Sequence, residues 1–198
     1  MDIQLNKSER ELLEKIALAA QQSQVEAYLI GGFVRDKLLG RATKDADIVC
    51  VGDGIGLANR AATFFTPIPK VAFFKNYGTA HFKVQQFDVE FVGARKESYQ
   101  QHSRNPTVTT GTLTDDQNRR DFTINALAIS LNKNDYGSLT DPFGGLEDLQ
   151  NKIIRTPLDP DITFSDDPLR MMRAIRFAAQ LHFEIAAETF EAICRNHE

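Results

Sequence analysis

The sequence predicts an α+β fold, in which a small mixed or antiparallel sheet is backed by helices and followed by a run of helices. The first observation is a series of three strand-like apolar runs with no helix between them, at 71–74, 80–84 and 87–92. Strands that follow one another in this way favour antiparallel pairing. The second observation is a helical spacing of apolar residues over 165–180, which continues over 184–197.

The N-terminal part of the chain supplies the other elements around the sheet. Residues 1–24 predict an amphipathic helix, because apolar residues recur at helical spacing among glutamates, at Leu5, Leu12, Leu13, Ile16 and Leu18. Four elements follow: a buried strand at 27–30, a helix over 33–39 capped by Gly40, a strand at 47–51 and a helix over 54–61.

The region after the three strands is less regular. Residues 96–114 are polar and contain Pro106 and Gly111, which predicts a mobile loop. Residues 116–130 predict a helix. Three short elements follow: a strand or hairpin edge at 136–141, a helix at 146–149 and a strand at 153–154.

The composition limits the classes of protein to which the chain can belong. The chain has a net charge of −4 and an isoelectric point near 5.6, which excludes a strongly basic, general nucleic-acid binder. No apolar stretch approaches the roughly 20 residues that span a bilayer. Cys50 and Cys194 lie far apart and have no Cys/His spacing around them, so they predict buried thiols in a reducing cytosol. We therefore expect a cytoplasmic protein without a membrane partner.

Asp45 and Asp47 are the first candidate site. If they begin a strand, residues i and i+2 point to the same face and the two carboxylates converge. Like charges this close are costly unless a divalent cation lies between them, and Mg²⁺ prefers such oxygen ligands. The same pattern also occurs in solvated turns and helix caps, so it is not specific by itself.

Gly31 and Gly32 lie between a predicted strand and a predicted helix. Glycines let the backbone approach a ligand, and a helix N-terminus presents N–H groups to anions, so the pair predicts a phosphate cradle. Arg35 lies on the first helical turn, and its guanidinium could donate hydrogen bonds to a triphosphate oxygen. A plain strand-to-helix turn with a surface arginine is the alternative.

A third pattern is a row of charged residues spaced by three, which on one helix would form a single polar stripe. The row consists of Asp167, Arg170, Arg173 and Arg176. A solvated helix face would have the same appearance.

Four stretches resemble, in order, motifs A to D of the bacterial (class II) tRNA nucleotidyltransferase and poly(A) polymerase family, within the polymerase-β-like nucleotidyltransferase superfamily. Motif A is matched by 29–40 with 44–49, motif B by 119–127, motif C by 141–149 with 154–155, and motif D by 166–177. Each motif is suggestive, and a chance run of all four is implausible. Asp166 stands where many relatives carry glutamate, which preserves a carboxylate at the helix start.

The resemblance assigns roles to motif A. It implies that Asp45 and Asp47 hold two catalytic metal ions, Mg²⁺ or alternatively Mn²⁺, and that the glycines with Arg35 contact the incoming nucleotide. One ion would lower the pKa of the RNA 3′-hydroxyl and the other would hold the triphosphate. A third catalytic carboxylate is expected on a later strand. Glu90 is our choice, because 90–95 resembles the strand that leads into the family's flexible loop; a solvent-facing acidic edge is the alternative.

Motif B implies further contacts. By resemblance, Arg120 contacts the nucleotide, while Asp121 and Asn125 bind the sugar or order the site. On a helix these two residues would be i and i+4 and would share a face. Arg119 is expected to lie on the surface.

Motif D implies how the base is read. Asp167 and Arg170 resemble the pair that selects cytosine and adenine, which both present an amino donor beside a ring-nitrogen acceptor. A carboxylate accepts from the amine and a guanidinium donates to the nitrogen, whereas uracil and guanine would leave these groups unpaired. Arg173 and Arg176 would neutralise phosphate.

The resemblance thus implies an enzyme that adds CMP and AMP from CTP and ATP to the 3′ end of tRNA. A bacterial poly(A) polymerase and a CC-only or A-only tRNA enzyme are the alternatives, and a non-catalytic nucleotide- or RNA-binding module is a distant one. The expected domains are an N-terminal helix (1–24), a nucleotidyltransferase head (25–155) and the start of a helical neck (156–198). Because the chain ends inside a helical pattern without a capping signal, we expect a fragment of a longer protein, and we expect the fragment alone to extend tRNA poorly.

Overall fold

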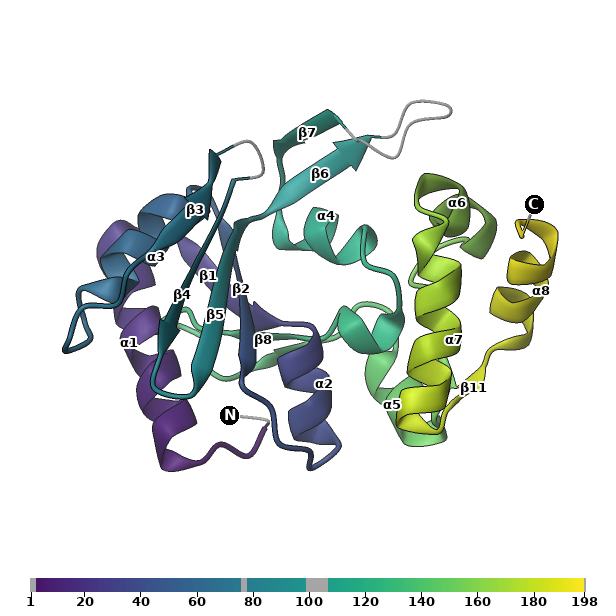
Figure 1. The fold of residues 1–198 in the computed structure, drawn as a ribbon, viewed down its shortest axis with the longest axis horizontal. Helices are drawn as coiled ribbons and strands as arrows, with labels where there is room; N and C mark the ends of the chain where they lie inside the picture. Colours follow the sequence, from purple (N-terminus) through teal and green to yellow (C-terminus); the bar gives the residue numbers. More distant parts are fainter. Residues whose placement is uncertain (1–2, 76–77, 99–106, 198) are drawn as a thin grey trace.

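The fold was obtained as a computed structural model, which describes residues 3–75, 78–98 and 107–197. Its centre is a seven-stranded sheet in the order β3-β4-β5-β2-β1-β8-β9 (Figure 1). The strands are β1 (Glu26–Ile30), β2 (Asp45–Val51), β3 (Ala72–Phe74), β4 (Thr79–Val84), β5 (Phe87–Gly93), β8 (Ala128–Ser130) and β9 (Leu139–Thr140). Strands β2 and β5 pair in parallel and the other neighbours are antiparallel, so the predicted mixed sheet is confirmed.

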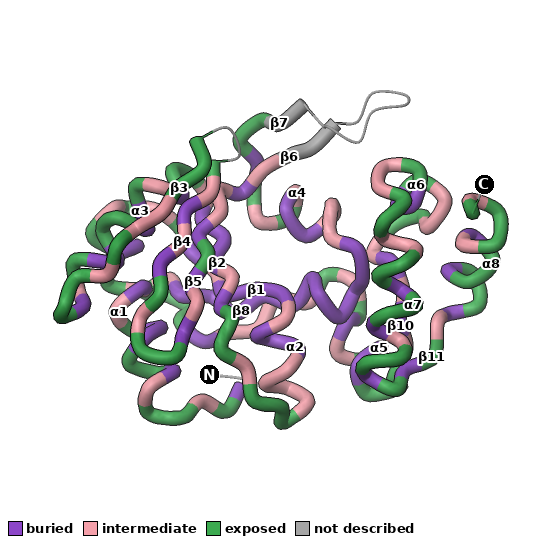
Figure 2. The backbone as a smooth tube through the Cα atoms, viewed as in Figure 1, coloured by how far each residue is buried: buried purple, intermediate pink, exposed green. Residues whose placement is uncertain are grey.

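One face of the sheet is covered by α1 (Lys7–Ser23) and α3 (Gly54–Ala62), which pack side by side (Figure 1). The main core lies between these helices and the inward-facing strand positions, such as Ile48, Phe82 and Phe91. Along β4 and β5, buried residues alternate with residues that are mostly half-buried, as the colours of Figure 2 show. This alternation follows from the period of two in a strand with one buried face. Within α1, Leu18 is 49% exposed, so it does not belong to the buried stripe in which the sequence pattern placed it.

The opposite face of the sheet is left for the polar strand positions. A small second cluster covers part of it, with Ile30, Val49, Ala94 and Ala128 buried beneath Leu113 of α4 (Leu113–Asn118). The helix α2 (Gly32–Leu38) follows β1 directly and ends before Gly40, whose φ of +68° confirms the predicted glycine cap.

Two predictions for the middle of the chain were wrong. Residues 96–114 are not all loop, because β6 (Arg95–Ser98) and β7 (Thr107–Thr110) pair as an antiparallel ribbon; residues 99–106 lie outside the described part. The helix predicted over 116–130 is only the end of α4, followed by a 3₁₀ turn (Thr123–Asn125) and strand β8. Every residue of β8 is buried, so no alternation marked it as a strand, and pairing with β1 decided its conformation.

The C-terminal third is largely helical. It contains α5 (Gly145–Asn151), α6 (Pro160–Asp166), α7 (Leu169–Leu181) and α8 (Ala187–Arg195), with a short parallel pair of β10 (Ile153–Ile154) and β11 (Glu184–Ile185). The single helix predicted over 165–180 is broken at Asp167, which is extended at φ −147°. Pro168 causes the break, because proline disfavours the helical conformation of the residue before it. The helix predicted from 184 begins only after β11.

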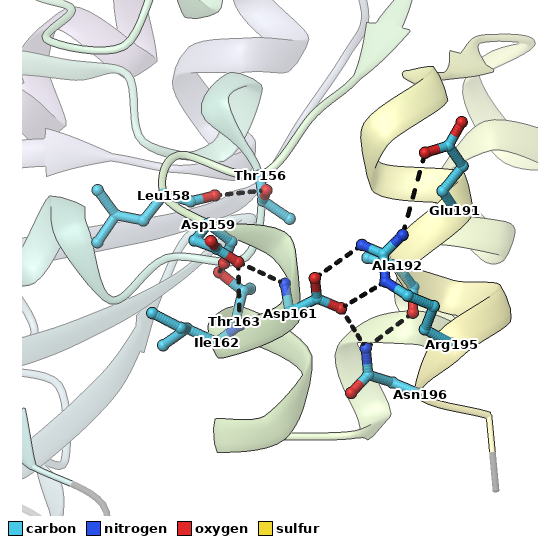
Figure 3. Close-up of polar contacts among 10 residues, drawn as sticks. All are labelled: Thr156, Leu158, Asp159, Asp161, Ile162, Thr163, Glu191, Ala192, Arg195 and Asn196. Atoms are coloured by element: carbon cyan, nitrogen blue, oxygen red, sulfur yellow. Dashed lines mark hydrogen bonds and ion pairs between the residues drawn. The ribbon is translucent and has the colours of Figure 1, made fainter.

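Polar contacts hold α8 against α6. The Asp161 carboxylate accepts hydrogen bonds from Arg195 Nη2 at 2.7 Å and from Asn196 Nδ2 at 2.7 Å (Figure 3). The helix α6 begins at Asp159, whose side chain accepts from the backbone N–H of Asp161 at 2.8 Å. These contacts fix the orientation of α6, which leads into Asp167.

Both cysteines are free thiols. Cys50 is buried, as expected, and burial raises the pKa of its thiol to about 12, but Cys194 is exposed on α8. In the described ranges, no helix combines the length and apolar character needed to cross a membrane.

Candidate active site

Asp47 and Glu90 face each other across the parallel pair of β2 and β5. Their Cα positions are in register, as are those of Asp45 and Asp88 one pleat away. All four lie on the face of the sheet opposite the main core, because Ala46, Ile48, Val89 and Phe91 take the buried positions. Strand periodicity thus places Asp45, Asp47 and Glu90 on a common face.

The pKa of Asp47 is raised from 3.8 to about 6. Burial is the main cause, Arg120 opposes it, and the charges of Glu90 and Asp45 raise the pKa further. A carboxylate with raised pKa is one whose ionised form lacks sufficient positive charge around it. The site is therefore electrostatically suited to a cation.

The donor set fits Mg²⁺ in kind, since it offers carboxylate oxygens. Within the described ranges, no three acidic, histidine or cysteine side chains are placed to hold one ion by themselves. Mg²⁺ commonly takes one or two carboxylates and completes its shell with water and substrate phosphate. The arrangement therefore fits an ion held jointly by the protein and a phosphate ligand.

A hollow of about 430 Å³ opens beside Asp47 and Glu90 and extends to the helical third of the chain. Its polar lining comes from three segments: Asp47 and Glu90 of the sheet, Arg119, Arg120 and Asp121 after α4, and Asp167, Arg170 and Arg173 at the start of α7. Asp45 lies outside this hollow and borders a second one, of about 520 Å³, together with Arg41 and Lys44. The first hollow brings most of the candidate residues together.

Gly31 permits the close approach of α2 to this hollow. Its φ is +79°, and a Cβ at this position would lie 2.9 Å from Arg120 Nη1 and 3.5 Å from Asp47 Oδ2. A side chain here would be strained and would press on the arginine. Gly32 has more room, with Arg35 Nη2 at 3.6 Å as its nearest neighbour.

Arg119 and Arg120 are both held by Asp116, a residue that the sequence pattern did not single out. The Asp116 carboxylate is fully buried and accepts from Arg119 Nε at 3.0 Å and from Arg120 Nη2 at 3.1 Å. The signal was present, because residues i+3 and i+4 on a helix face the same side. Arg119 is thus partly buried and lines the hollow instead of lying free on the surface.

Asp121, Asn125 and Arg35 form a buried network that begins at the wall of the hollow, where Asp121 lies. Asn125 Nδ2 donates to Asp121 Oδ1 at 3.0 Å, and Arg35 Nη1 donates to Asn125 Oδ1 at 2.7 Å. The two motif B residues meet as predicted, but through a 3₁₀ turn instead of an α-helix. Arg35 is only 5% exposed, and Asp36 accepts from its Nε and Nη2, so its guanidinium faces this network and not the hollow.

The helix α7 joins the network through Arg173, whose Nε donates to Asp121 Oδ2 at 2.6 Å. Arg170 Nη2 donates to the backbone carbonyl of Arg119 at 2.8 Å, which fixes its guanidinium at the hollow. Asp167 precedes the helix instead of lying on it, and its Oδ1 accepts from the backbone N–H of Leu169 at 3.1 Å. The polar row is therefore not one helical stripe.

Phe177 is a second residue that the sequence pattern missed. Three guanidinium groups lie over its ring, those of Arg35, Arg173 and Arg176, with distances to the ring centroid of 5.1, 5.2 and 4.8 Å. Such contacts between a cation and an aromatic ring are attractive. Arg176 is exposed and does not line the hollow.

Comparison with known proteins agrees with this geometry. A family model described as the poly A polymerase head domain matches residues 27–155. The A-adding tRNA nucleotidyltransferase of Aquifex aeolicus is 46% identical over 165 residues, which are 83% of this chain and 20% of the relative. The CCA-adding enzyme of Anoxybacillus flavithermus is 41% identical over 179 residues, which are 86% of this chain and 41% of the relative.

Solved structures are similar over nearly the whole chain. A CCA-adding enzyme in an apo form superposes with a TM-score of 0.87 at 34% identity and covers 96% of this chain and 44% of its own. A tRNA nucleotidyltransferase complexed with a primer tRNA and an incoming ATP analog has a TM-score of 0.80 at 39% identity, over 92% of this chain and 49% of its own. The chain spans between a fifth and a half of the length of these proteins. It belongs to the poly A polymerase head domain family, the family of the tRNA nucleotidyltransferases.

Proposed function

We propose that this chain is the nucleotide-transferring part of an enzyme that adds CMP and AMP from CTP and ATP to the 3′ end of tRNA. The observation that carries the proposal is the hollow between the sheet and α7. It combines the acidic pair Asp47 and Glu90 with Asp167 and Arg170 from the helical third. The relatives named as A-adding and CCA-adding enzymes support the same reaction class.

In this proposal the arginines bind the triphosphate and the start of α7 reads the base. Arg119 and Arg120 are fixed by Asp116, so their guanidinium groups are oriented before the ligand arrives. Asp167 accepts from the exocyclic amine of cytosine or adenine, and Arg170 donates to the neighbouring ring nitrogen. Asp121 and Asn125 order the site from behind, as their hydrogen bond indicates.

Asp45 and Asp47 are the residues that we expect to hold Mg²⁺, or Mn²⁺ in its place, with Glu90 as the third catalytic carboxylate. When bound, the metal supplies acidification of the RNA 3′-hydroxyl and neutralisation of phosphate charge. The raised pKa of Asp47 supports this role, because a nearby cation would favour its ionised form. Arg173 and Arg176 add positive charge on the side of α7.

The proposed unit has three parts: the N-terminal helix (1–24), the nucleotidyltransferase head (25–155) and the start of a neck (156–198). Both tRNA and nucleoside triphosphates are cytoplasmic substrates, and free thiols suit a reducing compartment, so we place the protein in the cytoplasm.

Primer extension by the full-length protein tests the proposal. The substrates are a tRNA that ends at the discriminator base, a tRNA that ends in CC and an unrelated RNA, each with CTP, ATP or both and with Mg²⁺. Addition of C, C and A followed by a stop would establish CCA addition, whereas A alone, added only to the tRNA ending in CC, would establish an A-adding enzyme. Long A tails on every RNA would make it a poly(A) polymerase.

The control is the pair of variants Asp45→Asn and Asp47→Asn, with and without EDTA. The proposal expects incorporation to stop in both variants and in EDTA, and to return in the wild-type protein when Mg²⁺ is restored. Nucleotide binding without any incorporation by the wild-type protein would contradict transfer and favour a binding module.

A further inference from the structure

The open face of the sheet continues beyond the carboxylates, away from the nucleotide hollow. In β4, His81 is the cross-strand partner of Glu90, which is itself in register with Asp47. These three residues therefore form one row across neighbouring strands. His81 lies on the same face as Glu90, since the alternating residues Ala80 and Phe82 point into the core.

Diagonal to His81, at the edge of the sheet, lies an exposed aromatic residue of β3. Phe74 is 56% exposed, and its ring is nearly parallel to that of His81, with an interplanar angle of 15° and a centroid distance of 6.4 Å. Phe74 pairs with Thr79, and Ala72 pairs with His81, so Phe74 and His81 are diagonal neighbours on one face. The adjacent Phe73 pairs with Ala80 and points to the other face, although its exposure is a similar 49%.

Two substrates must meet at the carboxylates if the proposed function holds. The hollow between Glu90 and α7 is lined by the residues that suit a nucleoside triphosphate, so the RNA strand must approach from another direction. From Glu90, the open face leads over β4 to β3, which is roughly 10 Å at the ordinary strand spacing. That span suits one nucleoside whose ribose lies at the carboxylates and whose base lies over β3 and β4.

We propose that Phe74 and His81, which we call the aromatic platform, stack the 3′-terminal base of the RNA strand and so position its ribose beside Glu90. This inference rests on the proposed function and assigns the acceptor side of the same site. Stacking on an aromatic ring accepts any base, because every base has a π-face. An enzyme whose acceptor ends first in the discriminator base and then in cytosine requires that tolerance.

The charges around the platform agree with an RNA strand. Lys75 follows Phe74 directly, and Lys83 lies two residues from His81 on the same face of β4. Lys83 is 74% exposed while its Nζ lies 2.7 Å from Asp88. Because Asp88 partly neutralises the charge of Lys83, Lys75 provides the local positive charge for a phosphate backbone in a chain whose net charge is −4. A second copy of the chain pairing at the β3 edge is the competing occupant.

Steady-state kinetics with the full-length protein test the platform. Phe74→Ala should raise the KM for a tRNA lacking its terminal adenosine about tenfold or more, and leave the KM for ATP unchanged. Phe74→Tyr should restore the wild-type value, and Phe73→Ala, on the other face of the same strand, should not change it. An unchanged RNA KM in Phe74→Ala, or an equal rise in Phe73→Ala, would overturn the proposal.

A tRNA whose 3′-terminal nucleotide is abasic separates stacking from other contacts. For the wild-type protein, the abasic acceptor should bind more weakly than the normal acceptor, by about the same factor as Phe74→Ala weakens binding of the normal acceptor. In Phe74→Ala, the abasic and the normal acceptor should bind equally well. Independent, additive losses would show that the base lies elsewhere.

A binding measurement keeps the platform separate from the transfer reaction. The probe is an RNA with 2-aminopurine at its 3′ terminus. Its fluorescence should be quenched when it binds to the wild-type and Phe73→Ala proteins, and much less when it binds to Phe74→Ala. This readout holds even if no RNA is extended, so failure of the proposed function would be distinguished from failure of the platform. Quenching that does not depend on Phe74, or a change of oligomeric state as the main effect of Phe74→Ala, would contradict RNA stacking.

Discussion

Arg173 of α7 donates a hydrogen bond to Asp121 at 2.6 Å and so connects the helical third of the chain to the sheet domain. Asp121 is 8% exposed and also accepts a hydrogen bond from Asn125, whose side-chain oxygen in turn accepts one from Arg35. The residues that we propose to read the base and those that we propose to hold the metal lie on different sides of this contact. The relative position of α7 and the sheet therefore decides whether the site is complete.

Replacement of Arg173 should loosen this connection. In Arg173→Ala, Asp121 loses its guanidinium partner, and hydrogen bonds to charged groups contribute about 1.5–3 kcal/mol. Because Arg173 is 43% exposed, we expect the lower end of that range in the free energy of unfolding, together with a fall of about tenfold or more in kcat/KM. Urea unfolding and primer extension measure both. Arg60→Ala, which removes an exposed charge from α3, should change neither.

The pKa of Asp47 makes stability depend on pH in a defined direction. The folded pKa of about 6 lies above the ordinary 3.8, so the folded state binds this proton more tightly than the unfolded state. The free energy of unfolding therefore falls as pH rises from about 4 to 6, by about 3 kcal/mol at most. Above pH 6 the protein stays destabilised by this full amount. Asp47→Asn should remove this slope and be more stable than the wild type at pH 8.

Thermal unfolding of metal-free protein between pH 4 and pH 8 measures the effect. Asp45→Asn is the matched control, because Asp45 is exposed and its replacement removes only one of several charges near Asp47. Both variants should lack activity, but only Asp47→Asn should be clearly stabilised. If the melting temperatures of Asp47→Asn and the wild type depend on pH in the same way, Asp47 does not have the raised pKa.

Gly31 should tolerate no side chain. Gly31→Ala places a Cβ 2.9 Å from Arg120 Nη1 at a φ of +79°, so it combines backbone strain of about 1–2 kcal/mol with displacement of the arginine. Gly40→Ala has a similar φ of +68° but nothing within 4 Å of the added Cβ. We expect a loss of stability in both variants, larger in Gly31→Ala, and a loss of nucleotide affinity only in Gly31→Ala. Calorimetric titration with CTP distinguishes them, and equal affinity in both variants would contradict the packing argument.

Base selection should depend on the start of α7. Asp167→Ala and Arg170→Ala should each lower the incorporation of CTP and ATP by about 10–100-fold, because a charged hydrogen bond is lost. The ratio of CTP or ATP incorporation to UTP or GTP incorporation should also fall in both variants. Single-turnover incorporation of the four nucleotides measures the ratios. Met172→Ala, 65% exposed on the same helix and outside the hollow, should keep the wild-type preference. A preference that survives both site variants would place base reading elsewhere.

The sequence alone determined the elements whose burial alternates or whose ends carry a signal. The acidic pair was predictable because a strand period of two puts Asp45 and Asp47 on one face, and the register with β5 then placed Glu90 beside them. The end of α2 just before Gly40 was predictable from the glycine cap, β4 and β5 from their alternating burial, and β3 from its short apolar run.

Only the tertiary structure decided the conformation of the fully buried and the mutually paired segments. Strand β8 shows no alternation because both its faces are covered, and its pairing with β1 overrides the helical pattern around it. The burial of Arg35 depends on its hydrogen bond to Asn125, a contact between distant segments that side-chain spacing does not encode. The sequence thus predicted the candidate site residues, and packing of α7 against the sheet decided which of them line the hollow and which lie outside it.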